Sequence, residues 1–128
     1  MAQWTVRIAG HGSRTTSATK AANKTFALRI IRMTQALPRS READVIARQI
    51  LRSATSIAAN YRAAGRGRSK AEFIAKLGLV IEETDETVLW LELLVESGIM
   101  KPAKLQALLD EANQLLALFA ASWHTLKG

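Results

Sequence analysis

Residues 70–96 read KAEFIAKLGLVIEETDETVLWLELLVE. Apolar side chains recur in this stretch on two interleaved lines with a seven-residue period, which is typical of a long helix packed along its length against other helices. Ser69 followed by Glu72 is a capping-box pattern and predicts a start at Lys70, whereas Ser97 and Gly98 predict an end at Glu96. The two lines are Ile74, Ile81, Val88 and Val95, and Leu77, Thr84 and Leu91.

Three further helices are expected around this one. They span residues 23–37, which end before Pro38, residues 40–64, and residues 102–126, which begin with Pro102. The second stops at residues 65–67, where glycines permit a left-handed turn. No segment alternates as a strand does, so the pattern predicts an all-α protein, an antiparallel up-down-up-down four-helix bundle. The expected inner positions are Phe26, Ile30, Met33 and Leu37; Ile46, Ile50, Ser53, Ile57 and Tyr61; and Leu105, Leu109, Ala112, Leu116, Phe119, Trp123 and Leu126.

The composition limits the chain to one globular domain. It has 128 residues, of which 48% are hydrophobic, and residues 1–22 are expected to form a flexible N-terminal arm in front of the bundle at 23–128. No secretory signal or membrane-spanning stretch is recognised, so a cytoplasmic protein is expected. The absence of Cys excludes disulfides and thiolate metal sites, and the two histidines, His11 and His124, are far apart in sequence.

Charge is unevenly distributed along the chain. Residues 1–76 hold 15 Lys/Arg and 3 Asp/Glu, a balance of +12, and residues 77–128 hold 3 and 8, a balance of −5, which together give the net charge of +7. This polarity indicates either a basic face for nucleic acid or complementary contacts between copies of the chain. Alternatively, the two halves neutralise each other within one bundle.

The helix at 40–64 carries a line of arginines opposite its apolar side. At about 100° per residue, three of them project within about 40° of Arg48, whereas its apolar residues lie between about 160° and 220°. Such guanidinium groups can neutralise phosphates, or they can pair with acids on a neighbouring helix or subunit. Without interleaved aromatic residues, any binding is expected to be directed at the backbone. The candidate nucleic-acid-binding residues are Arg41, Arg48, Arg52, Arg62, Arg66, Arg68 and Lys70.

Two other groups of residues are candidate sites. Glu82, Glu83, Asp85 and Glu86 form an acidic cluster, but no Glu-x-x-His pair accompanies them, so no metal, cofactor or catalytic residue is expected. A second apolar patch lies opposite the core line of the same helix, where a monomeric bundle should be polar. It indicates self-association, unless the N-terminal arm folds over it. The patch consists of Leu79, Leu89, Trp90 and Leu93.

Residues 49–69, QILRSATSIAANYRAAGRGRS, resemble the four-helix-bundle family of proteins encoded in 23S rRNA intervening sequences, which is related to the accessory variability determinant of diversity-generating retroelements. The resemblance spans roughly residues 26–126. It departs from the family where Ala63 or Ala64 replaces a glutamate and where Leu79 replaces a serine. The matching residues are Gln49, Arg52, Ser56, Ile57, Asn60, Gly65, Arg68 and Ser69, followed by Gly78 and Glu82.

The structural motif residues Asn60, Gly65, Ser69 and Gly78 also have physical interpretations. A half-inward Asn60 can fix helix register or bond to the turn at Gly65. Gly78 inside a helix costs about 1 kcal/mol relative to Ala unless close backbone approach compensates, which indicates a notch for helix packing.

The resemblance implies a homo-oligomer, a pentameric ring, without enzymatic activity. It also implies a basic surface for RNA or DNA and, for some members, binding to a reverse transcriptase. Together with the arginine line it predicts a non-enzymatic nucleic-acid-binding accessory protein. The alternative is a protein-binding scaffold without nucleic-acid binding, in which Glu82, Glu83 and Glu86 cover the arginines within a ring.

Overall fold

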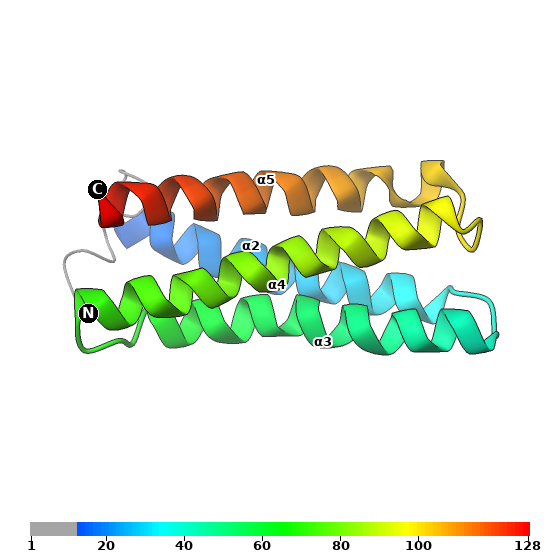
Figure 1. Ribbon diagram of the computed structural model, residues 1–128, viewed down its shortest axis with the longest axis horizontal. Helices are drawn as coiled ribbons and strands as arrows, with labels where there is room; N and C mark the ends of the chain where they lie inside the picture. The colour runs from blue at the N-terminus through cyan, green and yellow to red at the C-terminus, as the bar shows by residue number, and fades with distance from the viewer. Residues whose placement is uncertain (1–12) are drawn as a thin grey trace.

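A computed structural model describes the backbone of residues 13–128 and the side chains of residues 17–128 (Figure 1). The helices are α2 (Ser13–Gln35), α3 (Arg41–Ala64), α4 (Lys70–Glu96) and α5 (Pro102–Lys127). They lie side by side and successive helices run in opposite directions, so the start of α2 and the end of α5 meet at one end of the bundle (Figure 1). This arrangement confirms the expected all-α, up-down-up-down bundle.

Side chains at the helix ends explain why α3 and α4 begin where they do. The hydroxyls of Ser40 and Ser69 each accept a hydrogen bond from the backbone N–H three residues later, at 3.1 Å. The Glu72 carboxylate accepts a hydrogen bond from the Arg68 N–H at 3.3 Å. In this capping box the glutamate therefore bonds to the residue before the N-cap, and not to the N-cap itself. Pro102 begins α5, as expected, and Gly98, at φ 80°, makes the turn after α4.

The first helix begins earlier than the sequence pattern indicates. α2 starts at Ser13, so the expected start at Asn23 is wrong by ten residues, and residues 13–22 do not form the expected flexible arm. Thr19 and Asn23 are buried and continue the apolar side of α2 toward its N-terminus. Both are polar, which hides the helical period from a search for apolar residues. The remainder of the expected arm, residues 1–12, lies outside the described residues.

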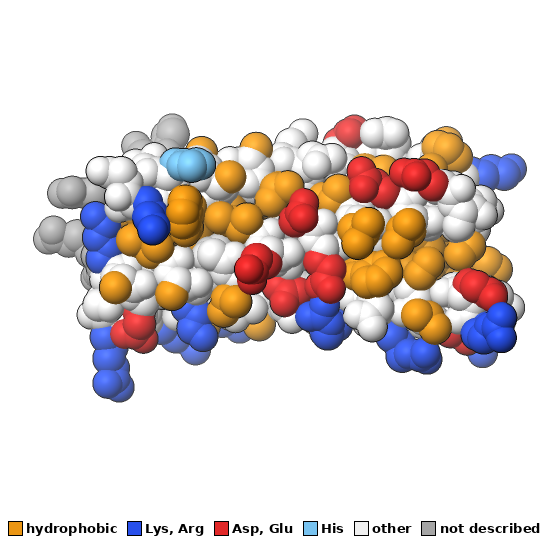
Figure 2. Space-filling view, viewed as in Figure 1, with side chains coloured by type: hydrophobic (Ala, Val, Ile, Leu, Met, Phe, Trp, Pro, Cys, Tyr) orange, Lys and Arg blue, Asp and Glu red, His pale blue; other side chains and the backbone are white. Residues whose placement is uncertain are grey.

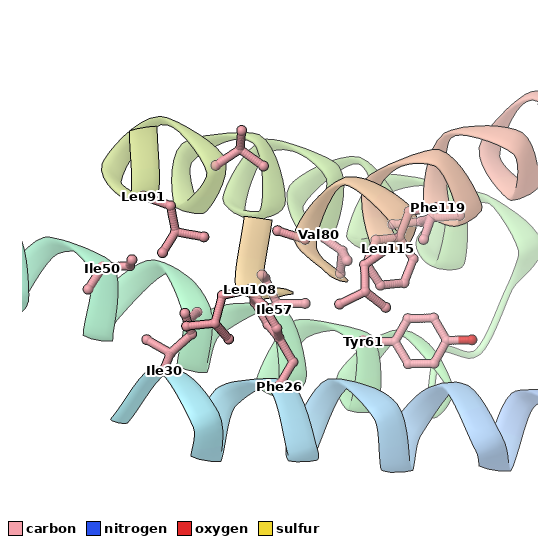
Figure 3. Close-up of a cluster of buried hydrophobic side chains, with 14 of the residues drawn as sticks. Phe26, Ile30, Ile50, Ile57, Tyr61, Val80, Leu91, Leu108, Leu115 and Phe119 are labelled. Carbon is pink, nitrogen blue, oxygen red and sulfur yellow. The ribbon is translucent and has the colours of Figure 1, made fainter. Parts of the chain in front are cut away.

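The core lies between all four helices (Figure 3). The expected inner positions of α2 and α3 are buried or half-buried, and Tyr61 of α3 packs against Phe119 of α5 with ring centroids 5.6 Å apart. On α4 the Leu77, Thr84 and Leu91 line is fully buried, as expected. On the other expected line, Val88 is buried as predicted, but Ile74, Ile81 and Val95 lie at the edge of the core. Their neighbours Phe73, Val80 and Leu94 are fully buried instead.

The α4 helix packs against both α3 and α5, and its buried face is correspondingly broad. The buried line includes Thr87, whose hydroxyl meets that of Ser53 on α3 at 2.8 Å. Each hydroxyl also lies within hydrogen-bonding distance of a carbonyl of its own helix. The two hydroxyl protons supply two of these three contacts, which is enough to give each hydroxyl a partner inside the core. None of the helices in the described part of the chain is long and apolar enough to cross a membrane.

Candidate nucleic-acid interface

A groove of about 420 Å³ lies between α2 and α3, near the end of the bundle where α2 begins. Its charged lining residues are Lys20 and Lys24 from α2 and Arg62 and Arg66 from α3 and the turn after it. The other lining residues are three alanines, so no other side chain reaches across the groove; they are Ala58, Ala59 and Ala63. The structure thus places four cations around one hollow.

Gly65, at the end of α3, lies beside Lys20, one of these four cations. Gly65 has φ −63°, an ordinary helical value, so the expected left-handed turn is wrong. Instead, a Cβ at Gly65 would lie 3.4 Å from Lys20 Cε and 3.5 Å from Lys20 Nζ. These are ordinary van der Waals distances, and they show that the end of the Lys20 side chain lies against the last turn of α3.

Arg52 lies on the opposite flank of α3 and faces α4. Its guanidinium donates to Glu83 Oε2 at 3.2 Å and also to Glu86. The hydrogen bond that Arg52 donates to Glu86 raises the pKa of Arg52, and the nearby Glu83 charge adds to this. Burial raises the pKa of Glu83, which Arg52 opposes and Glu86 reinforces. Arg52 is therefore held by two carboxylates, as the scaffold alternative requires, but within one chain.

The remaining predicted cations differ in whether they form an ion pair. Arg41 is exposed and, among residues 17–128, pairs with its neighbour Glu42 alone, at 3.1 Å. Within residues 17–128 no carboxylate pairs with any of the other five, all of which are exposed. Figure 2 shows acidic side chains along the middle of α4, with a fringe of basic side chains over α3 below them. The five are Arg48, Arg62, Arg66, Arg68 and Lys70.

The outer face of α4 carries exposed leucines between its acids. Leu79, Leu89 and Leu93 are 44%, 46% and 38% exposed, so the sequence placed them on the correct side. Trp90 was expected beside Leu93 but packs against the core, half-buried. Its indole N–H is buried and has no hydrogen-bond acceptor among residues 17–128.

The motif residues have mainly local surroundings. Ser69 caps α4, and Asn60 is half-buried, with no side-chain hydrogen bond to any of residues 17–128. The fully buried asparagine is Asn23, whose amide finds no partner among the same residues. A Cβ at Gly78 would lie 4.0 Å from Trp123 Nε1 and would fit, so the close backbone approach expected there is not found.

The sequence prediction missed Lys20 and Lys24 because Lys20 precedes the expected start of the first helix at Asn23 and Lys24 lies in its expected first turn. A signal was present: residues 19, 23, 26, 30 and 33 keep a 4-3-4-3 spacing, and the lysines are four residues apart beside that line. In the described part of the chain, no three Asp, Glu or His side chains are grouped so as to hold a metal ion.

The same architecture occurs in known proteins. The family model described as 23S rRNA-intervening sequence protein matches residues 18–121. The chain belongs to this family. A crystal structure from Bacteroides thetaiotaomicron, described as a protein of unknown function from the S23 ribosomal protein family, is 31% identical with a TM-score of 0.78. The match covers 88% of this chain and 98% of that one. Among curated proteins, none matches the chain.

The family match begins inside α2, at residue 18, and so includes both groove lysines. It ends before the last turn of α5. Most of the bundle, including the α2–α3 groove, therefore lies within the family domain.

Proposed function

We propose that this member of the family is a non-enzymatic protein that binds the phosphodiester backbone of RNA or DNA through the basic side of α3. The supporting observation is that five of the seven predicted cations, which lie on α3 and in the residues just after it, are exposed and make no ion pair within residues 17–128. Exposed Lys and Arg contribute to nucleic-acid binding by neutralising phosphates and releasing counterions.

A salt titration tests this proposal. The dissociation constant of a fluorescein-labelled single-stranded 20-mer RNA is measured by anisotropy between 50 and 200 mM KCl. The logarithm of the association constant is expected to fall linearly with the logarithm of salt, by about 0.7 for each phosphate neutralised. Failure to bind either this RNA or duplex DNA at 50 mM KCl would contradict the proposal.

One observation supports the alternative, a protein-binding scaffold without nucleic-acid binding. Glu83 and Glu86 do pair with an arginine of α3, but within residues 17–128 that arginine is Arg52 alone. For that alternative to hold, a second copy of the chain would have to cover the other five cations.

We further propose that the protein self-associates through the outer face of α4, as a ring of five if it follows the family resemblance. Light scattering after size-exclusion chromatography is expected to show an oligomer for the wild type and a monomer for Leu89→Glu/Leu93→Glu. The control, Leu28→Glu/Val45→Glu, makes the same charge change at exposed apolar residues of α2 and α3 and should remain oligomeric. Equal dissociation of both variants, or a monomeric wild type, would contradict this interface.

A reverse transcriptase is the protein partner that the family resemblance suggests, and it remains a proposal. The test is co-purification of this chain with a reverse transcriptase encoded beside its gene. Co-purification that survives nuclease treatment supports a protein–protein contact, whereas loss on nuclease treatment indicates a nucleic-acid bridge.

A further inference from the structure

We infer that the groove between α2 and α3 is where the phosphodiester backbone binds, with Lys20 and Lys24 contacting the phosphates alongside Arg62 and Arg66. This inference rests on the proposed nucleic-acid binding. It adds to that proposal two residues outside the predicted arginine line and a defined track between two helices.

Charge distinguishes this groove from another basic hollow among the described residues. That hollow, of about 390 Å³, lies between α2 and α5 and is also lined by Arg29, Arg32 and Lys104. Arg29 is bound there to Glu111, so a carboxylate already compensates part of the charge. Among residues 17–128 no carboxylate pairs with any of the four groove cations. An incoming phosphate is therefore their natural counter-charge.

The arrangement of the cations suits an extended ligand better than a single ion. Because α2 and α3 are antiparallel and Lys20 lies against Gly65, Lys24 lies about one helical turn further along the groove, toward Arg62. Four residues of helix rise about 6 Å, so the two walls offer cations at two successive levels. A chain of phosphates can use both levels, whereas one inorganic phosphate cannot.

The lining also defines which part of a nucleic acid is recognised. It contains no aromatic residue and no amide or hydroxyl side chain, only cations and alanines. Bases have nothing to stack on and no side-chain partners that read their edges, so the protein binds the phosphates. We therefore expect similar affinity for RNA strands of different sequence.

The test compares two lysine pairs that carry the same charge change. Lys20→Gln/Lys24→Gln is expected to weaken binding of the labelled 20-mer RNA at least tenfold at 50 mM KCl. It should also reduce the magnitude of the salt slope by about 1.4, because two fewer phosphates are neutralised. The control, Lys101→Gln/Lys104→Gln, changes exposed lysines at the opposite end of the bundle and should weaken binding less than threefold. Circular dichroism should show that both variants keep the helical content of the wild type.

The outcomes separate this inference from the proposed function. Equal loss of affinity in the two variants would show that only net charge matters, which overturns the groove but leaves nucleic-acid binding intact. A wild type that binds neither RNA nor DNA overturns both. In a competition arm, adenosine monophosphate should fail to displace the RNA at concentrations where unlabelled 20-mer displaces it fully. Displacement at equal phosphate concentration would overturn an extended backbone track.

Discussion

The two flanks of α3 both present arginines, but the arginines differ in whether they form ion pairs. Toward α4, Arg52 lies between Glu83 and Glu86 and donates to both. Toward α2, Arg62 and Arg66 line a groove with two lysines and make no ion pair within residues 17–128. A cation's availability to a ligand therefore depends on the helix opposite it, not on its place in a sequence pattern.

The difference follows from the charges of the neighbouring helices. The described part of α2, residues 17–35, has lysines and arginines but no carboxylate, whereas residues 82–86 of α4 contain four. Helix α3 thus lies between a basic and an acidic neighbour. Surface ion pairs contribute little to stability, so the pairing with α4 matters mainly because it removes a cation from the binding surface.

Reversing one charge on each flank would test this comparison most strongly. Arg62→Glu places a negative charge in the groove and is expected to lower RNA affinity by about tenfold or more at low salt, with little change in thermal stability. Arg52→Glu places a third carboxylate beside Glu83 and Glu86, and the repulsion should lower the melting temperature. Its effect on RNA affinity should stay within about threefold. Anisotropy and thermal melting on the two variants measure both effects.

Both variants change the net charge by the same amount, so each serves as the other's control. Equal losses of RNA affinity would show that α3 acts as one uniform basic face, as the arginine line alone suggests. A larger loss for Arg52→Glu would mean that nucleic acid displaces the carboxylates of α4, and the contrast between the flanks would then be wrong.

Local signals were sufficient to predict most of the helices. Ser69 precedes the start of α4, Gly98 follows its end, and Pro102 begins α5. These positions were predictable because caps and prolines set helix ends through contacts within a few residues. The start of α2 was missed because its buried line continues through Thr19 and Asn23, whose polar side chains break the apolar period. Burial of these residues depends on the other helices.

Ion pairing between helices was the property least predictable from the sequence. The arginine line correctly places Arg48, Arg52 and Arg62 on the solvent side of α3, since that follows from helical geometry alone. Which of these three arginines pairs with a carboxylate depends on the packing of α4 against α3, which places Glu83 and Glu86 next to Arg52. The groove lysines required both the longer α2 and its alignment with α3.

The smallest expected effect concerns the pH dependence of the paired flank. Burial raises the pKa of Glu83 above its ordinary value near 4.5, even though Arg52 opposes the shift. The folded state therefore binds this proton more tightly than the unfolded chain does. Its contribution to the free energy of unfolding is largest at low pH and falls as pH rises from about 4.5 to the folded pKa.

Glu83→Gln removes that titration, so the stability of the variant relative to the wild type should rise between pH 4 and pH 7. Urea denaturation at several pH values measures the difference, with the exposed Glu82→Gln as the control for loss of one carboxylate. A relative loss of stability over the same range would mean that Arg52 lowers the pKa of Glu83 more than burial raises it. The pairing of α3 with α4 would then be an ordinary ion pair that favours the charged acid, and acidification would release Arg52 by protonating its partner.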